Sequence, residues 1–276
     1  MARVEDGTAP RRARGRPRGW DGGGGQAPIQ ALDRAMAVLE TLSELSGATL
    51  SDLADETGVP TATLYRILTT LEQRGIVDFD PAPQTWAIGA GAFRIGSRFL
   101  RRTSLVERAR PVLRALMEAT GETANLGIAR DGQVLFVSQV ETHESIRAFF
   151  PPGTMSPMHA SGIGKALLAQ MTPEHAARVT ARQGLEAFTP RTLITPQALA
   201  EDLARTRQRG YAVDDEEKTI GMRCIAAPIF DIHGEAVAGL SISGPSARVP
   251  DAAVAALSGQ VIDAAQTVTQ AIGGEA

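Results

Sequence analysis

The chain has 276 residues, which is enough for two domains with ordinary hydrophobic cores. Hydrophobic residues make up 43% of it and charged residues 21%, as in a soluble globular protein. No apolar run approaches the ~20 residues that a bilayer-spanning helix needs. Because the Arg- and Gly-rich start also lacks the apolar core of a secretory signal, we expect a cytoplasmic protein with no membrane partner.

The formal net charge of -3 hides an asymmetry along the chain. Residues 1–120 hold 16 basic and 14 acidic residues, whereas the remainder holds 12 basic and 17 acidic ones. A basic half that binds DNA can therefore coexist with an acidic half that does not. The single cysteine, Cys224, excludes an internal disulfide framework, and four scattered histidines without ligand spacing predict no metal site.

Residues 1–28 are of low complexity and predict a disordered basic tail. Within it, Arg14, Arg16 and Arg18 alternate with a glycine and a proline, as in the core of an AT-hook. Such a backbone lies extended in the narrow minor groove of DNA, where arginines meet a strong negative potential. The alternative is a solvated tail that adds only nonspecific phosphate contacts.

Residues 29–90 predict a winged helix-turn-helix domain. Apolar residues recur at helical spacing over Gln30–Leu45, which indicates a supporting helix. Two short helices then surround a tight turn at Gly58, where a residue with positive φ is needed. Thr61 or Thr63 is expected to cap the second helix of this pair.

Two β-prone runs, Ile76–Asp80 and Thr85–Ile88, predict the hairpin wing. The preceding helix carries short hydroxyls, a phenol and an arginine opposite its buried stripe, and these groups suit phosphate oxygens and base edges. An ordinary solvated face would be richer in Glu and Lys, although the same helix pair also occurs in purely structural bundles. The candidate DNA-contacting residues are Thr61, Thr63, Tyr65, Arg66 and Thr69.

The rest of the chain predicts a linker helix over 91–104 and an α+β domain over 105–276. Strand patterns begin at Thr123 with a hairpin that turns at Arg130–Gly132, and helical and strand-like segments then alternate around a curved sheet. The expected helices are Ala92–Leu100, Leu105–Ala119, Ile163–Met171, Pro173–Gln183, Pro196–Arg209 and Asp251–Ile272, and the later strands are Ile225–Asp231 and Ala236–Ser243.

A candidate ligand site lies on the last of these strands. Alternation places Gly239, Ser241 and Ser243 on one face, which leaves room for a small polar ligand. Backbone amides of Ser161–Lys165, where a loop enters a helix, could receive a carboxylate. This segment is not a nucleotide-binding P-loop, because His159 and Ala166 stand where glycine and a hydroxyl residue are required.

Asp214 and Cys224 lie on segments that flank the same strand. Each candidate has an ordinary structural alternative. The two serines could bond to neighbouring backbone, the cysteine could be a small buried hydrophobe, and Asp214 could belong to a solvated run of charges.

The order of these segments resembles the IclR family of bacterial transcription regulators from about Ile29 to Ile272. The residues that carry the resemblance are GVPTATLYRILTTLEQRGIV, MHASGIGKALLA, RGYAVDDEEKTIGMRCIAAPIFD and GEAVAGLSISGP. The resemblance implies an N-terminal winged helix, a C-terminal GAF-like effector domain, no cofactor, and dimers that pair into tetramers on a double-stranded DNA operator.

The chain most resembles the glyoxylate-sensing subgroup, which includes the allantoin regulon repressor and the regulator of the β-hydroxyaspartate cycle. This resemblance implies an effector-controlled affinity for DNA, with pyruvate or glycolate as alternative effectors. Ile163 stands where a smaller residue is common in the family. The implied effector-binding residues are Gly162, Ile163, Asp214, Cys224, Ser241 and Ser243, with a pocket wall of Met155, Met158 and Leu240.

Two other functions compete with this hypothesis. A cysteine-dependent enzyme would use Cys224 as nucleophile and His159 or His233 as base, but the sequence places no histidine beside Cys224. An architectural DNA protein would bind through the Arg-rich tail and respond to no small molecule. We therefore expect a regulator and not an enzyme.

Overall fold

The computed structural model describes residues 28–101 and 104–274. These residues form two compact units that divide between Ile95 and Gly96. The predicted basic tail, with Arg14, Arg16 and Arg18, lies outside the described residues. In the described part of the chain, no helix is both long and apolar enough to cross a membrane.

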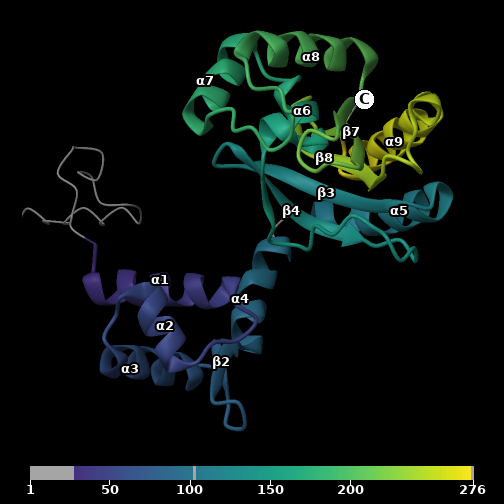
Figure 1. The fold of residues 1–276 in the computed structure, drawn as a ribbon. Coiled ribbons are helices and arrows are strands. Elements are labelled where there is room, and N and C mark those ends of the chain that lie inside the picture. Colours follow the sequence, from purple (N-terminus) through teal and green to yellow (C-terminus); the bar gives the residue numbers. More distant parts are fainter. Residues whose placement is uncertain (1–27, 102–103, 275–276) are drawn as a thin grey trace, which may run out of the picture. The chain divides into compact units, whose positions relative to one another are not determined.

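The first unit contains the helix pair and the wing that the sequence predicts (Figure 1). Three helices are followed by an antiparallel two-stranded hairpin, and α4 then leads out of the unit. The core includes Val38, Leu53, Leu64, Leu68 and Trp86, all at most 4% exposed. The elements are α1 (Gln30–Glu44), α2 (Leu50–Thr57), α3 (Thr61–Glu72), β1 (Val77–Asp80), β2 (Thr85–Ile88) and α4 (Ala90–Arg101).

Local signals set the ends of α2, and one prediction about α3 is wrong. Thr49 and Asp52 form a reciprocal capping box at the start of α2, which ends at Gly58 with φ of 65°. At the start of α3, however, Pro60 holds the capping position and no side chain of a described residue caps the helix. Thr61 and Thr63 instead lie within the first turn, because the fixed φ of proline already sets the chain for helix entry.

The second unit is built on a six-stranded antiparallel sheet in the order β5-β4-β3-β8-β7-β6. The predicted hairpin turns at Asp131 and Gly132, as expected. The sequence did not predict β5 and β6, which are short strands at the two edges. The strands are β3 (Thr123–Arg130), β4 (Gln133–Val140), β5 (Met155–Pro157), β6 (Ala212–Asp215), β7 (Met222–Phe230) and β8 (Ala236–Pro245).

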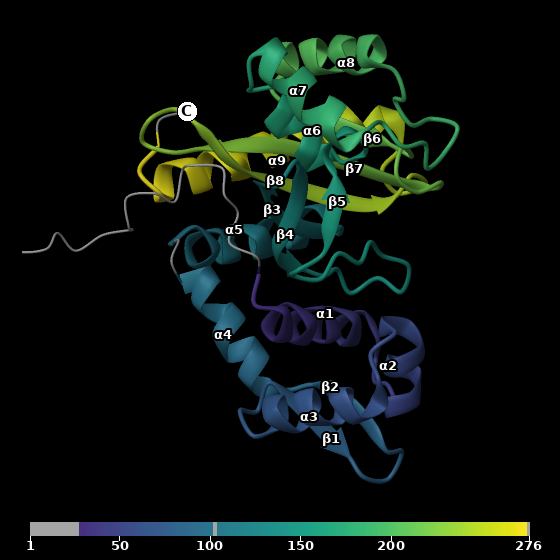
Figure 2. The same ribbon diagram turned by 90° about the vertical axis from the view of Figure 1, so that its left-hand side faces the viewer.

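Helices cover both faces of this sheet (Figure 2). On one face, α5 (Ser104–Thr120) and α9 (Asp251–Ala271) bury Leu126, Leu240 and Ile242. On the other face, three helices and a short 3-10 turn enclose a second core with Phe136 and Ala226. These elements are η1 (Met158–Ala160), α6 (Gly162–Leu168), α7 (Pro173–Gln183) and α8 (Pro196–Arg209). The predicted α+β class is confirmed.

Candidate functional site

The exposed face of α3 carries most of the candidate DNA-contacting side chains. Thr61, Tyr65 and Arg66 are exposed, and the tyrosine residue is 55% accessible. Thr69 is half-buried, and its hydroxyl donates to the carbonyl oxygen of Tyr65 at 2.8 Å. That hydroxyl is therefore left to accept, rather than donate, a further hydrogen bond.

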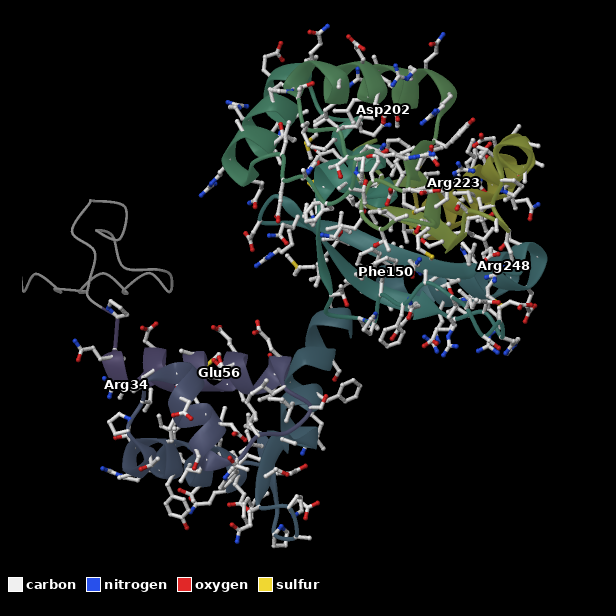
Figure 3. The ribbon with its side chains drawn as sticks, viewed as in Figure 1. Arg34, Glu56, Phe150, Asp202, Arg223 and Arg248 are labelled. Carbon is white, nitrogen blue, oxygen red and sulfur yellow. The ribbon has the colours of Figure 1, made fainter. Side chains whose placement is uncertain are left out.

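Thr63 is half-buried and lies near α1. It lines a groove of about 400 Å³ between α1 and α3, together with Arg34, Arg66 and Thr70. Sequence reasoning missed Arg34 (labelled in Figure 3) because it lies on a different helix from the other candidates. The groove brings two guanidinium-bearing residues to the edge of α3.

The polar candidates of the second unit meet in one row across the sheet. On adjacent strands, Asp214 pairs with Cys224, and Cys224 pairs with Ser243. Ser241 lies two residues before Ser243 on the same face of β8, and the start of α6 faces them. They line a small cavity with Phe136, Phe150, Ser156, Ala160, Ser161, Gly162, Ile163 and Lys218. Phe150 is labelled in Figure 3.

Two amides that the sequence did not single out orient the cavity serines. Asn125 Nδ2 donates to Ser243 Oγ at 3.2 Å and to Ser241 Oγ at 3.5 Å, while Gln139 Nε2 donates to Asn125 Oδ1 at 3.0 Å. A hydroxyl that accepts from an amide keeps its own proton for another acceptor. Both serines line the cavity together with Cys224.

The segment that begins α6 approaches the sheet very closely. A Cβ on Gly162 would lie 2.7 Å from Cys224 Sγ. The Ile163 side chain is buried over Gly239, where an added Cβ would lie 2.7 Å from Ile163 Cγ2. The space beside Gly239 that the sequence assigned to a ligand is thus filled by Ile163.

The predicted pocket wall is wrong. Leu240 points to the opposite face of β8 and packs with α5 and α9, because strand residues alternate. Met158 is buried in the core beneath α6, and Met155 is 42% exposed at the sheet edge, where its neighbour Ser156 points inward. The apolar wall is formed instead by the rings of Phe136 and Phe150, which stack with centroids 4.9 Å apart.

A buried cluster of charges supports the cavity from the side of α8. Lys165 is fully buried, and its Nζ lies 2.5 Å from Glu217 Oε1 and 2.9 Å from Asp202 Oδ2. The Glu217 amide donates to Asp214 Oδ1 at 2.8 Å. Asp202 (labelled in Figure 3) comes from α8, so one ammonium connects α6, α8 and the segment that follows β6.

Burial sets the protonation of these groups. Desolvation raises the pKa of Asp214 to about 6 against the opposing effects of its hydrogen bond from Glu217 and the charge of Lys165. Desolvation likewise raises the pKa of Glu217 to about 7. Burial, helped by the nearby Asp214 charge, raises the pKa of Cys224 to about 11, so this residue is a neutral thiol at pH 7.

The site does not form a cysteine nucleophile with its base. The His159 ring pairs through Nε2 with the carbonyl oxygen of Glu186 at 3.0 Å, and His233 lies in the exposed turn before β8. Within residues 28–101 and 104–274, neither histidine bonds to Cys224 and no cluster of side chains could hold a metal ion. A protonated thiol without a base is a poor nucleophile.

A larger cavity of about 460 Å³ lies between α7 and α8, but its lining is mostly alanine and leucine. Arg207 is at its edge, where its guanidinium already donates to the carbonyl oxygens of Ala169 and Met171. A small charged ligand would find few polar partners there. The polar cavity beside Cys224 is therefore the better candidate for an effector site.

Comparison with known proteins identifies both units. A family model described as the IclR helix-turn-helix domain matches residues 31–81, and one described as the bacterial transcriptional regulator IclR C-terminal matches residues 97–270. The first match spans the helix pair and part of the wing. The second spans all six strands of the sheet and nearly all of the helices that cover it.

Relatives that match nearly the whole chain are also transcription regulators. The HTH-type transcriptional regulator BhcR of Paracoccus denitrificans is 55% identical over 261 residues, with 94% of each chain covered. The transcriptional repressor IclR of Escherichia coli is 45% identical over 249 residues, with 89% of this chain and 91% of the repressor covered.

A solved structure shows the same fold. It is an IclR homolog from Microbacterium hydrocarbonoxydans complexed with 4-hydroxybenzoate, at a TM-score of 0.78 and 26% identity, with 88% of this chain and 98% of that one covered. The likeness confirms the N-terminal helix-turn-helix domain and the GAF-like effector domain. Since the matched domains and relatives are those of regulators, the protein is not the cysteine-dependent enzyme considered above. The chain belongs to the IclR family of bacterial transcription regulators.

Proposed function

We propose that glyoxylate is the effector of this regulator and that it binds in the cavity beside Cys224. The observation that carries the proposal is that Ser241, Ser243, Gly162 and Asp214 line one small cavity around Cys224. Hydroxyls and amides can donate to a carboxylate, while the thiol and Asp214 can contact the aldehyde or its hydrate. Ile163 contributes its backbone and the buried side chain that closes the site.

The size of the cavity supports a small effector. Its free volume is about 20 Å³, a little above the ~10–15 Å³ that one water molecule requires. A two-carbon acid is larger than one water and must widen the cavity by small side-chain shifts, whereas an aromatic acid such as the 4-hydroxybenzoate of the Microbacterium homolog would need a much larger opening. Pyruvate and glycolate differ from glyoxylate by one group each and are the competing effectors.

On the DNA side, we propose that α3 contacts the operator through Thr61, Tyr65, Arg66 and Thr69, with Thr63 and Arg34 at the edge of the same surface. The N-terminal turn of α3 has no side-chain cap, so its amides can face a phosphate. The basic tail with Arg14, Arg16 and Arg18 would add minor-groove or phosphate contacts.

The proposal includes self-association and a cytoplasmic location. Dimers that pair into tetramers would place two helix-turn-helix domains on successive half-sites of an operator. Large apolar side chains on α1 support contact with a second copy, because Leu32 is 58% exposed and Met36 is 47% exposed. A DNA-binding regulator of bacteria acts in the cytoplasm.

Calorimetric titration with glyoxylate, pyruvate and glycolate tests the effector. We expect tight, selective glyoxylate binding that weakens in Cys224→Ser and in the double variant Ser241→Ala, Ser243→Ala. Loss of two hydrogen bonds to a charged group would raise Kd by at least about 100-fold. If the double variant bound glyoxylate as the wild type does, the effector site would have to lie elsewhere.

A further inference from the structure

The chain uses lysine at only two positions, Lys165 and Lys218, among 28 basic residues. Both lie at the effector cavity or directly behind it. Lys165 is held by Glu217 and Asp202 inside the protein. Lys218 follows Glu217 in the connection between β6 and β7 and lines the cavity itself.

Lys218 is half-buried and is paired with an aromatic ring. Its Nζ lies 3.2 Å from the centroid of the Phe188 ring. Burial lowers the pKa of this ammonium, while the charges of Glu186 and Asp214 act in the opposite direction. The side chain thus carries a partly desolvated charge toward Asp214 and the cavity.

A carboxylate in the cavity needs a positive charge to balance Asp214, and Lys218 can supply it. A carboxylate that enters beside Asp214 meets a like charge whenever Asp214 is ionised. Lys165 is already shared between two carboxylates, so it has little attraction left for a third. Among the cavity-lining residues, all of which the structure describes, Lys218 alone is positively charged.

We propose that Lys218 is the residue that pairs with the carboxylate of the effector and so restricts the site to small acids. The ammonium leaves the Phe188 ring and turns toward the ligand. This inference rests on the proposed function, because it assigns the counter-charge of the same cavity. Sequence reasoning named the donors of the site but not this cation.

Physical properties of the side chain favour this role. A cation–π contact is weaker than a charge-assisted hydrogen bond to a carboxylate, so the exchange of partners is favourable. An ammonium is a compact point charge on a flexible stem, so it can turn toward a ligand in a small cavity. An arginine has a broad planar head, which explains why lysine is used here in a chain otherwise rich in arginine.

The test is calorimetry on the full chain with glyoxylate and with neutral glycolaldehyde. Lys218→Met is expected to raise the Kd for glyoxylate on the order of 10- to 100-fold and to leave the weak binding of glycolaldehyde unchanged. Lys218→Arg keeps the positive charge and should lose less affinity for glyoxylate than Lys218→Met does. The control is Arg209→Met, which removes a cation–π pair with Tyr211 (4.7 Å) outside the cavity and should bind glyoxylate normally.

The outcomes separate this inference from the proposed function. If the wild type and Lys218→Met bind glyoxylate equally, Lys218 is not the counter-charge and the cavity assignment stands. If Arg209→Met loses as much affinity for glyoxylate as Lys218→Met does, the loss does not come from a charge in the cavity. The same holds if Lys218→Met loses as much affinity for neutral glycolaldehyde as for glyoxylate. If the wild type binds none of glyoxylate, pyruvate and glycolate, the proposed function fails and this inference fails with it.

Discussion

Gly162→Ala should narrow the cavity beside Cys224 while leaving the fold intact. The new Cβ would lie 2.7 Å from Cys224 Sγ and 3.3 Å from Ala226 Cβ, where ordinary contact begins at 3.4 Å. The sulfur must therefore retreat into the cavity by roughly 0.7 Å. Because the free volume is about 20 Å³, a methyl group and a displaced thiol leave less room for the effector.

The expected magnitudes are different for stability and for binding. Overpacking costs about 1–3 kcal/mol, and the better helix propensity of alanine offsets up to ~1 kcal/mol of it. A net loss of ~1 kcal/mol lowers Tm by about 2–4 °C in a domain of this size. Effector binding should weaken roughly 10- to 150-fold, as if one hydrogen bond to the charged ligand were lost.

Thermal unfolding and glyoxylate calorimetry on the same samples measure both effects. Gly259→Ala is the matched control, because an added Cβ within α9 meets nothing within 4 Å. It should bind glyoxylate normally. Normal glyoxylate binding by a folded Gly162→Ala would refute the placement of the effector against Cys224.

Three further predictions concern DNA, pH and the thiol. Arg66→Ala should weaken DNA binding and lower the salt slope by about one phosphate contact, and an unchanged slope in filter-binding assays would remove Arg66 from the interface. Because the folded pKa of Asp214 is about 6 against an ordinary 3.8, the folded state holds the proton more tightly, so stability should fall as pH rises from about 4 to 6. Melting curves of Asp214→Asn should show a smaller fall, and an identical fall would assign the effect to other groups. With its pKa raised to about 11, Cys224 should react with iodoacetamide at pH 8 far more slowly than in the unfolded chain, and equal rates by mass spectrometry would contradict its protonated state.

Elements with strong local signals could be predicted from the sequence. The bounds of α7 and α8 are those expected, because each begins with threonine followed by proline and ends at a glycine. Gly58 likewise ends α2 with the positive φ that was predicted. The two edge strands were missed because β5 and β6 have three and four residues, too few to show a period.

The site residues could be predicted only where they lie on one strand, because alternation along a strand shows which side chains share a face. Alternation along β8 placed Ser241 and Ser243 on a common face, but the same rule should have removed Leu240 from the pocket wall. Asn125, Phe150 and Lys218 come from other parts of the chain. They reach the cavity through the pairing of strands and the course of long connections, which one sequence does not reveal.

The most direct test of the account is whether the effector changes DNA affinity. A duplex that the protein itself selects from a random-sequence pool would serve as operator, and its Kd would be measured with and without glyoxylate at fixed salt. We expect a change of about 5- to 150-fold, the usual range of coupling between two sites. The change should vanish in the Ser241→Ala, Ser243→Ala double variant, whose affinity for DNA alone stays normal. An unchanged Kd for the wild type with glyoxylate, pyruvate and glycolate alike would contradict control by a small oxoacid.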